Sequence, residues 1–162
     1  MTANGTTQHD KPCVLIVDDS RVVRVSVSRA LDGAFQVLQA EDGEKGLNRA
    51  KTLKPDLVIS DINMPNLDGY GLICQLRAED EDGLGDVPII VITSAEEDVV
   101  RERAYACGAN AFILKPFNPG QLMDSVLQHI ANHNASFADL ESTYGDRIES
   151  VVASDVVIQD ET

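Results

Sequence analysis

The sequence lacks the long apolar runs that cross membranes. None of its runs approaches the roughly 20 residues that a transmembrane helix needs, and its first twelve residues contain no apolar stretch of the signal-peptide type. We therefore expect no membrane insertion and a cytoplasmic location. The chain has 162 residues, 43% of them hydrophobic and 25% charged, which suits a globular protein that buries a real core.

Basic residues are scarce. Only 13 Lys and Arg residues oppose 27 Asp and Glu residues, so the formal net charge is −14. A chain of this charge repels phosphate backbones, and we expect no direct binding of nucleic acid. Cationic partners and divalent metal ions fit this charge better.

Cysteine is sparse as well. The three cysteines, Cys13, Cys74 and Cys107, are odd in number and form no CxxC motif or Cys/His cluster. This pattern argues against a disulfide framework and a zinc site. It predicts reduced, partly buried thiols.

Apolar patterns predict five strands that alternate with five helices. Apolar runs predict strands at residues 13–17, 34–40, 56–60, 87–93 and 111–114. Apolar residues at helical spacing predict helices at residues 20–31, 43–53, 68–79, 96–107 and 118–130. Because several strands are apolar on both faces and the linkers are short, we predict an α/β doubly wound domain with a parallel sheet.

Chemically active groups follow four of the five strands. The second strand ends on Gln39-Ala40-Glu41 and offers nothing comparable, whereas the other four end, in order, on Asp18 and Asp19, on Asp61, on Thr93 and Ser94, and on Lys115-Pro116. The carboxyl ends of parallel strands meet at one edge of the sheet, so three carboxylates, a hydroxyl and a lysine converge there. Converging acids repel one another, and a hard cation such as Mg²⁺ relieves that repulsion. A carboxylate beside a cation can also attack phosphorus.

Each of these groups, taken singly, has a structural interpretation. Asp18 or Asp19 can cap a helix, as can the S-x-x-E pattern of Ser94 and Glu97. Asp61 can be a loop acid, Lys115 a solvated lysine and Phe112 a core aromatic residue. The convergence of these groups at one edge of the sheet favours a functional site over these structural interpretations.

Four motifs, in this order, resemble the receiver domain of two-component response regulators, the CheY-like family. They are VLIVDDS (14–20), DINMPNLDG (61–69), ITSA (92–95) and FILKPF (112–117). The resemblance runs from about Lys11 to Ile130. It implies a flavodoxin-like sheet of five parallel strands in the order 2-1-3-4-5, with five helices.

The resemblance also implies a phosphorylation site with bound Mg²⁺, which Mn²⁺ can replace. Asp61 matches the phospho-accepting aspartate. The metal ligands would be Asp18, Asp19, Asp61 and the backbone carbonyl of Asn63. Met64-Pro65 and Gly69 are expected to shape the turn so that this carbonyl faces the metal ion.

The remaining matches concern the phosphoryl group and the switch. Thr93 matches the hydroxyl that moves toward the phosphoryl group, and Phe112 matches the aromatic residue that changes rotamer with it. Lys115 matches the lysine that pairs with phosphoryl oxygens, and its bond to Pro116 is cis in the family. The small Ala95 leaves the access of water open.

The implied function is a phosphorylation-activated signalling switch. A sensor histidine kinase or a phosphotransfer protein donates the phosphoryl group, and acetyl phosphate can substitute. The domain catalyses its own phosphorylation and dephosphorylation but turns over no separate substrate, so we expect no enzyme in the ordinary sense. The face built by the fourth helix, the fifth strand and the fifth helix then changes shape and controls a downstream protein or an output domain. Homodimerisation on phosphorylation is a further expectation.

Three other functions remain open at this point. The chain can be the regulatory N-terminal fragment of a larger enzyme, such as a cyclic-dinucleotide cyclase or phosphodiesterase, or a stand-alone adaptor for a motor or kinase. A phosphatase that uses Asp61 as its nucleophile is the third. Related α/β phosphatases carry a second acid two residues after the nucleophile, where this chain has Asn63, and this argues against a phosphatase.

The domain boundaries follow from composition. We expect a disordered leader at residues 1–10, the receiver domain at 11–131 and an acidic C-terminal tail or linker at 132–162. The tail has seven acidic residues against one basic residue, Arg147. Apolar residues seven apart suit a helix that pairs with another copy, and an amphipathic helix over Ser136–Val152 is the alternative. Disorder of the tail, and a strand at 155–160, are further interpretations.

Overall fold

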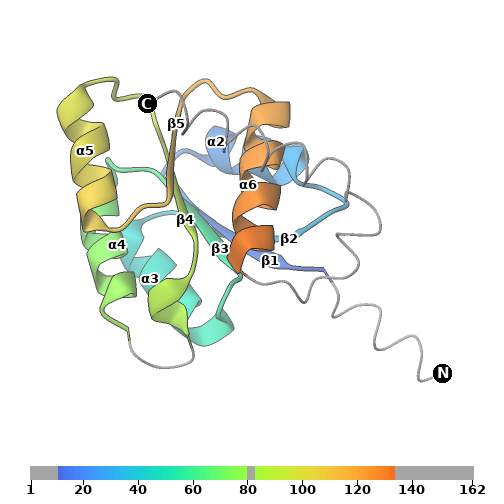
Figure 1. The fold of residues 1–162 in the computed structure, drawn as a ribbon, viewed down its shortest axis with the longest axis horizontal. Coiled ribbons are helices and arrows are strands. Elements are labelled where there is room, and N and C mark those ends of the chain that lie inside the picture. Colours follow the sequence, from blue (N-terminus) through green and yellow to red (C-terminus); the bar gives the residue numbers. More distant parts are fainter. Residues whose placement is uncertain (1–10, 80–82, 134–162) are drawn as a thin grey trace.

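Five parallel strands form the centre of the fold (Figure 1). The computed structural model describes residues 11–79 and 83–133. All strand pairs are parallel and the order is β2-β1-β3-β4-β5, which confirms the predicted doubly wound, flavodoxin-like sheet. The strands are β1 (Cys13–Val17), β2 (Gln36–Ala40), β3 (Leu57–Ser60), β4 (Ile89–Thr93) and β5 (Ala111–Leu114).

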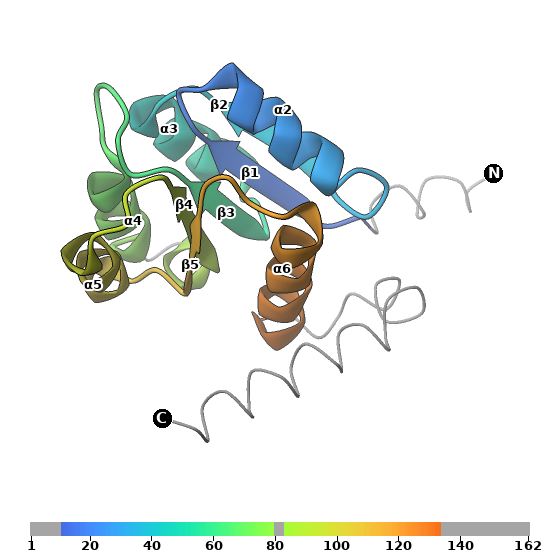
Figure 2. The ribbon, with the colours of Figure 1, turned by 90° about the horizontal axis from the view of Figure 1, so that it is seen from above.

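The helices cover both faces of the sheet. Figure 2 shows α2 and α6 on one face and α3, α4 and α5 on the other. All five predicted helices are present, and a short 3-10 helix, η1, was not predicted. The bounds are α2 (Arg21–Ala30), α3 (Gly43–Leu53), α4 (Gly69–Arg77), η1 (Leu84–Asp86), α5 (Asp98–Cys107) and α6 (Pro119–His133).

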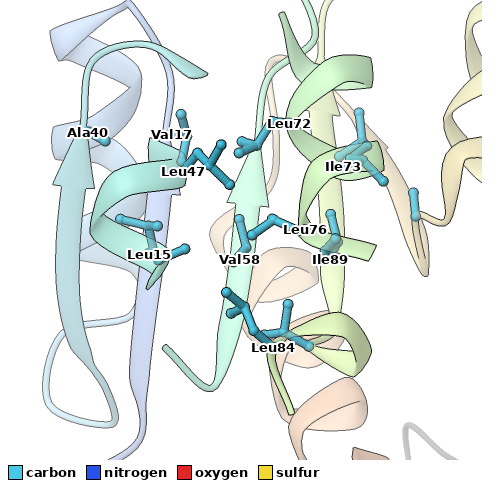
Figure 3. Packing of buried hydrophobic residues seen from close by; sticks show 14 of the residues in the cluster. Leu15, Val17, Ala40, Leu47, Val58, Leu72, Ile73, Leu76, Leu84 and Ile89 are labelled. Carbon is cyan, nitrogen blue, oxygen red and sulfur yellow. The ribbon is translucent and has the colours of Figure 1, made fainter. Parts of the chain in front are cut away.

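Each face of the sheet has its own hydrophobic core. Because side chains alternate along a strand, Val14 and Ile16 of β1 pack with α2 and α6, whereas Leu15 and Val17 pack with α3 and α4. Figure 3 shows the second core, in which Leu47 and three apolar residues of α4 lie against the sheet. The strands between the two cores are therefore rigidly held, and so are the residues that follow them.

Local capping explains where the helices begin and end. Ser20 caps α2 with its hydroxyl, and Asp42 and Asp68 cap α3 and α4 with their carboxylates. Gly108 ends α5 at a φ of 123°, a conformation that favours glycine.

The structural alternative for Ser94 and Glu97, a capping box, is not formed. Helix α5 begins at Asp98, its N-cap is Glu97, and Glu97 makes no side-chain cap bond. The residues after β4 do not enter the helix at once, and the amide of Ala95 donates instead to Oγ1 of Thr93 at 3.4 Å. Ser94 is thereby left beside the carboxyl edge of the sheet.

The interpretations of residues 1–10 and of most of the tail lie outside the described residues. Within the described part of the chain, α6 ends at His133, and no helix there combines the length and apolar character that crossing a bilayer requires. The three cysteines are free, and Cys13 and Cys107 are half-buried.

Candidate functional site

Strand register brings the predicted acids together. Val17 of β1 pairs with Ser60 of β3, so Asp18 and Asp61 follow directly paired residues. The amide of Asp61 donates to the carbonyl of Val17 at 3.0 Å, which extends this pairing by one step. The two carboxylates therefore leave the sheet at the same level.

Lys115 reaches this pair of acids from the end of β5, the strand at the edge of the sheet. Its amide donates to the carbonyl of Thr93 at 2.8 Å, which continues the pairing of β4 with β5. Its ammonium nitrogen lies 2.9 Å from Oδ2 of Asp18 and 3.0 Å from Oδ2 of Asp61. The structure thus unites the ends of β1, β3 and β5 around one lysine.

A third acid completes the cluster. Ligand oxygens of Asp18, Asp19 and Asp61 all lie within 4.8 Å of one another. Asp18 is fully buried and Asp61 is 6% exposed, whereas Asp19 is exposed to solvent. The cluster therefore has a buried floor and an open side.

Burial changes the ionisation of Asp18 and acts on that of Lys115. Loss of solvent raises the pKa of Asp18, and the charge of Asp61 raises it further, against the lowering effects of the Ser20 amide and of Lys115. Burial acts to lower the pKa of Lys115, but its contacts with both carboxylates outweigh burial and raise it. The lysine consequently stays charged, and without a metal ion the carboxylates of Asp18 and Asp61 repel each other.

The donor set fits a hard divalent cation. Oδ1 of Asp18 accepts from the amide of Ser20 at 2.9 Å, but the buried Oδ2 has no aligned hydrogen-bond donor despite its short contact with Lys115. A buried oxygen without a donor is costly, and a cation would satisfy it. Three carboxylates with solvent on one side match the oxygen ligands that Mg²⁺ prefers.

The turn after β3 holds Asp61 in a fixed orientation. Its Oδ1 accepts from the amide of Ile62 at 2.6 Å, and its carbonyl accepts from the hydroxyl of Ser60 at 2.8 Å. The amide of Gly69 closes the turn on the carbonyl of Ile62 at 2.8 Å. A Cβ at Gly69 would lie 2.2 Å from the carbonyl oxygen of Asp61, so only glycine fits there.

The other predicted residues surround this centre at different depths. Thr93 is 1% exposed, Phe112 is half-buried against the second core with the guanidinium of Arg101 5.9 Å from its ring centre, and the side chain of Asn63 is exposed. The Lys115–Pro116 peptide bond is cis. The structure describes no hydrogen bond between Thr93 and Asp61.

Sequence reasoning missed a contact to the backbone of Asp18. The guanidinium of Arg24 donates from Nη1 to the carbonyl of Asp18 at 2.7 Å and from Nε to the side chain of Gln39 at 3.1 Å. No motif marks Arg24. Its place on the second turn of α2, six residues after Asp18, is the only signal in the sequence.

Sequence reasoning also overlooked an acid in the turn after the second strand. Asp42, two residues beyond β2, is buried and accepts from the side-chain amide of Asn66 at 2.9 Å. Asn66 belongs to the turn that follows Asp61. The sequence offered a signal in the acid that precedes Gly43, but its partner could not be read from periodicity.

An open cleft of about 670 Å³ lies beside the site. Its apolar wall comes from α2 and from the segment between β5 and α6, and Ser94 and Lys115 line it next to the acids. The cleft gives a partner molecule access to the lysine side of the cluster.

Comparisons with known proteins agree with this geometry. The family model described as the response regulator receiver domain matches residues 14–127. The chain is 36% identical over 124 residues to the "Probable transcriptional regulator ycf27" of Porphyridium aerugineum, covering 74% of this chain and 50% of that protein. It is 35% identical over 126 residues to the KDP operon transcriptional regulatory protein KdpE of Escherichia coli, covering 77% and 54%.

A solved structure of a similar protein agrees with these matches. The chemotaxis protein CheY4 of Vibrio cholerae superposes with a TM-score of 0.67 at 31% identity, covering 74% of this chain and 98% of that one. The chain spans about half the length of the two curated relatives it matches. Both relatives carry the names of transcriptional regulators, and neither name mentions a cyclic-dinucleotide enzyme.

Proposed function

The chain belongs to the response regulator receiver family, and from this membership we propose that phosphorylation of Asp61 switches it between two signalling states. It is a signalling receiver and not an enzyme in the ordinary sense. The observation that carries the proposal is the convergence of Asp61 with Asp18, Asp19 and Lys115 at one edge of the sheet.

Asp61 is the nucleophile in this proposal. Its Oδ1 is held by the amide of Ile62, which leaves Oδ2 to attack phosphorus. The phosphorus–nitrogen bond of a phosphohistidine breaks as the new oxygen–phosphorus bond forms, and the histidine nitrogen of the donor keeps the electron pair and takes up a proton. With acetyl phosphate, acetate leaves in the same way. The domain thus promotes its own phosphorylation through the placement of its groups.

The surrounding charges would favour this step. Lys115 already contacts the attacking oxygen and can pair with a phosphoryl oxygen once the new group arrives. The ligands of Mg²⁺, or of Mn²⁺ in its place, would be the carboxylates of Asp18, Asp19 and Asp61 with the carbonyl of Asn63. A bound cation would neutralise phosphoryl charge and the repulsion among the acids.

The switch would pass through Thr93 and Phe112. Thr93 is buried at the end of β4, and its hydroxyl accepts from the amide of Ala95, a contact that a nearby phosphoryl group can replace. Phe112 is half-buried on β5 and can turn further inward when the Thr93 region moves. We expect the face formed by α5, β5 and α6 to change as a result.

That face is suited to a partner. Val99 and Tyr105 of α5 and Leu114 of β5 are large apolar side chains that are 67%, 43% and 43% exposed. Following the two transcriptional regulators, we propose an output domain or a downstream protein that controls transcription as its partner, with homodimerisation as one form of output. With a net charge of −14, this chain itself would not contact DNA.

We place the protein in the cytoplasm. The phosphodonor would reach the site there through the cleft beside Lys115. A sensor histidine kinase or a phosphotransfer protein can pack on the apolar wall of α2 and bring its phosphohistidine to the open side of the acids. We place the phosphorylated unit at residues 11–131, with the acidic residues 132–162 as a tail or linker.

The proposal is tested by the intact mass of the protein after incubation with acetyl phosphate and Mg²⁺. The wild type should gain one phosphoryl group, and Asp61→Asn should gain none. Omission of Mg²⁺ should suppress the gain in the wild type. Equal incorporation by Asp61→Asn would rule out the assignment of Asp61.

A further inference from the structure

Two turns meet on the side of the site that faces α3. One joins β2 to α3 and contains Asp42 and Gly43, and the other follows Asp61 and contains Asn66 and Leu67. A Cβ at Gly43 would lie 2.0 Å from the carbonyl oxygen of Leu67, so the two backbones touch. The turn after β2 therefore forms a wall against which the turn after β3 rests.

Asp42 joins the two turns. Its Oδ1 accepts from the amide of Lys45 at 2.8 Å and caps α3, while its Oδ2 accepts from Nδ2 of Asn66 at 2.9 Å. The Lys45 amide is the main cause of a lowered pKa of Asp42, which the Asn66 amide lowers further against the opposing effect of burial. Asp42 is 5% exposed, so it is a fixed, charged acceptor anchored on a helix.

Asn66 is the part of its turn that needs such an anchor. Its φ is +70°, a left-handed conformation that asparagine adopts more readily than most residues. The amide of Leu67 closes a tight turn on the carbonyl of Pro65 at 2.8 Å. The turn also leaves the side chain of Asn66 pointing at Asp42 from an otherwise exposed position.

The anchored point is close in sequence to both functional groups of the turn. Asn66 is three residues from Asn63, the proposed carbonyl ligand, and five residues from Asp61. The near end of the turn is fixed by Ile62 and the far end by Gly69. The bond to Asp42 fixes the middle.

We propose that the Asp42–Asn66 hydrogen bond is a positioning device that holds the turn after Asp61 in the shape required for binding Mg²⁺ and accepting the phosphoryl group. Asp42 and Asn66 are positioning residues, since neither is placed to touch the reacting atoms. The inference rests on the proposed function for its effect on phosphorylation. The rigidity of the turn itself can be measured without it.

A donor–acceptor exchange isolates this bond from the helix cap. Asp42→Asn keeps an oxygen to cap α3, because asparagine caps as well as aspartate. It leaves Asn66 opposite an uncharged amide, so the charge-assisted hydrogen bond is lost. Adding Asn66→Asp restores one donor and one acceptor with the roles reversed. Asn66→Gly removes the bond while accepting the left-handed backbone without strain.

The first measurement is hydrogen exchange of the amides of Asn63, Met64, Asn66 and Leu67 in metal-free protein, since Pro65 has no amide hydrogen. Exchange should be about fivefold faster in Asp42→Asn and in Asn66→Gly, as expected for the loss of one partly exposed, charge-assisted hydrogen bond, and near the wild-type rate in the double exchange variant. The second is the Mg²⁺ concentration for half-maximal thermal stabilisation, which should rise by a similar factor and recover in the same variant. The rate of phosphorylation by acetyl phosphate should follow it.

Asp68→Asn is the matched control. Asp68 caps α4 through the amide of Gly71 at 2.8 Å, so this variant also converts a capping acid to an amide, but without touching Asp42. It should leave exchange at Asn63–Leu67 and Mg²⁺ binding unchanged. Unaltered exchange in both single-bond variants, or a folded double exchange variant that stays as fast as Asp42→Asn, would overturn the inference. If the wild type accepts no phosphoryl group, the proposed function fails while the exchange data still decide on the positioning device.

Discussion

The ammonium group of Lys115 donates a hydrogen bond of 3.0 Å to Oδ2 of Asp61, although the two residues lie 54 positions apart in the chain. The lysine also contacts Asp18, so in the metal-free protein it places positive charge beside both buried acids. This relationship links the stability of the fold to the occupancy of the site by a metal ion.

Lys115→Met should destabilise the metal-free protein. The two side chains of the Lys115–Asp61 pair are 18% and 9% exposed, so removal of the cation leaves two nearly buried carboxylates without a counter-charge. We expect the free energy of unfolding to fall by about 2 kcal/mol in urea titrations with chelator present. Millimolar Mg²⁺ should recover most of the loss, because it relieves the same repulsion. An equal loss with and without Mg²⁺ would show that the lysine stabilises the fold in some other way.

Asp18→Asn should have the opposite effect on the metal-free protein. Burial is the main cause of the raised pKa of Asp18, so the folded state disfavours its charge more than the unfolded chain does. We expect the free energy of unfolding at pH 7 to rise, since a disfavoured buried charge is removed and Lys115 retains Asp61 as a partner. The gain should shrink as the pH falls, because an acid with a raised folded pKa stops opposing folding once it is protonated in both states. The same variant should lose the stabilisation by Mg²⁺, and a stabilising response to Mg²⁺ that matches the wild type would contradict the assignment of Asp18 as a ligand.

Binding of Mg²⁺ should weaken on acidification earlier than ordinary carboxylates would predict. Protons compete with the cation for Asp18, and its raised pKa moves that competition toward neutral pH. Calorimetric titrations between pH 8 and pH 4.5 should show affinity falling before the usual carboxyl pKa of about 3.9 is approached. A constant affinity across this range would mean that Asp18 is not the group that limits binding.

Gly69→Ala should abolish phosphorylation by acetyl phosphate. The new Cβ would meet the carbonyl oxygen of Asp61 at 2.2 Å and the Cα of Ile62 at 2.7 Å, so the turn that orients the nucleophile must shift. Gly33→Ala is a useful control, because Gly33 has a φ of +89° and its Cβ would meet no atom within 4 Å. The control should cost about 1 kcal/mol of stability from backbone strain and leave the rate of phosphorylation unchanged. Normal phosphorylation of Gly69→Ala would show that the reaction does not depend on the shape of the turn after Asp61.

The sheet and its active edge were predictable because few alternatives compete. Strands such as β3 and β4 are buried on both faces, and a parallel sheet then requires their carboxyl ends to share one edge. Asp18, Asp61 and Lys115 follow paired strand residues, so their meeting follows from register alone.

Contacts between turns were not predictable in the same way. The start of α5 was predicted at residue 96, two residues before Asp98, and the S-x-x-E pattern of Ser94 and Glu97 is not used as a cap. The bond of Asp42 to Asn66 joins turns that are 24 positions apart, and no periodicity encodes it. Such contacts depend on how closely two backbones approach, and this closeness becomes visible only in the folded chain.

We propose that Asp61, among three clustered acids, is the residue that becomes phosphorylated. This assignment is tested most directly by reducing the acyl phosphate with borohydride after incubation with acetyl phosphate and Mg²⁺, which converts the phosphorylated aspartate to homoserine, and by sequencing the peptides with tandem mass spectrometry. We expect homoserine at position 61 and unmodified aspartate at positions 18 and 19. Homoserine at position 18 or 19, or unmodified aspartate at all three positions after treatment, would contradict it.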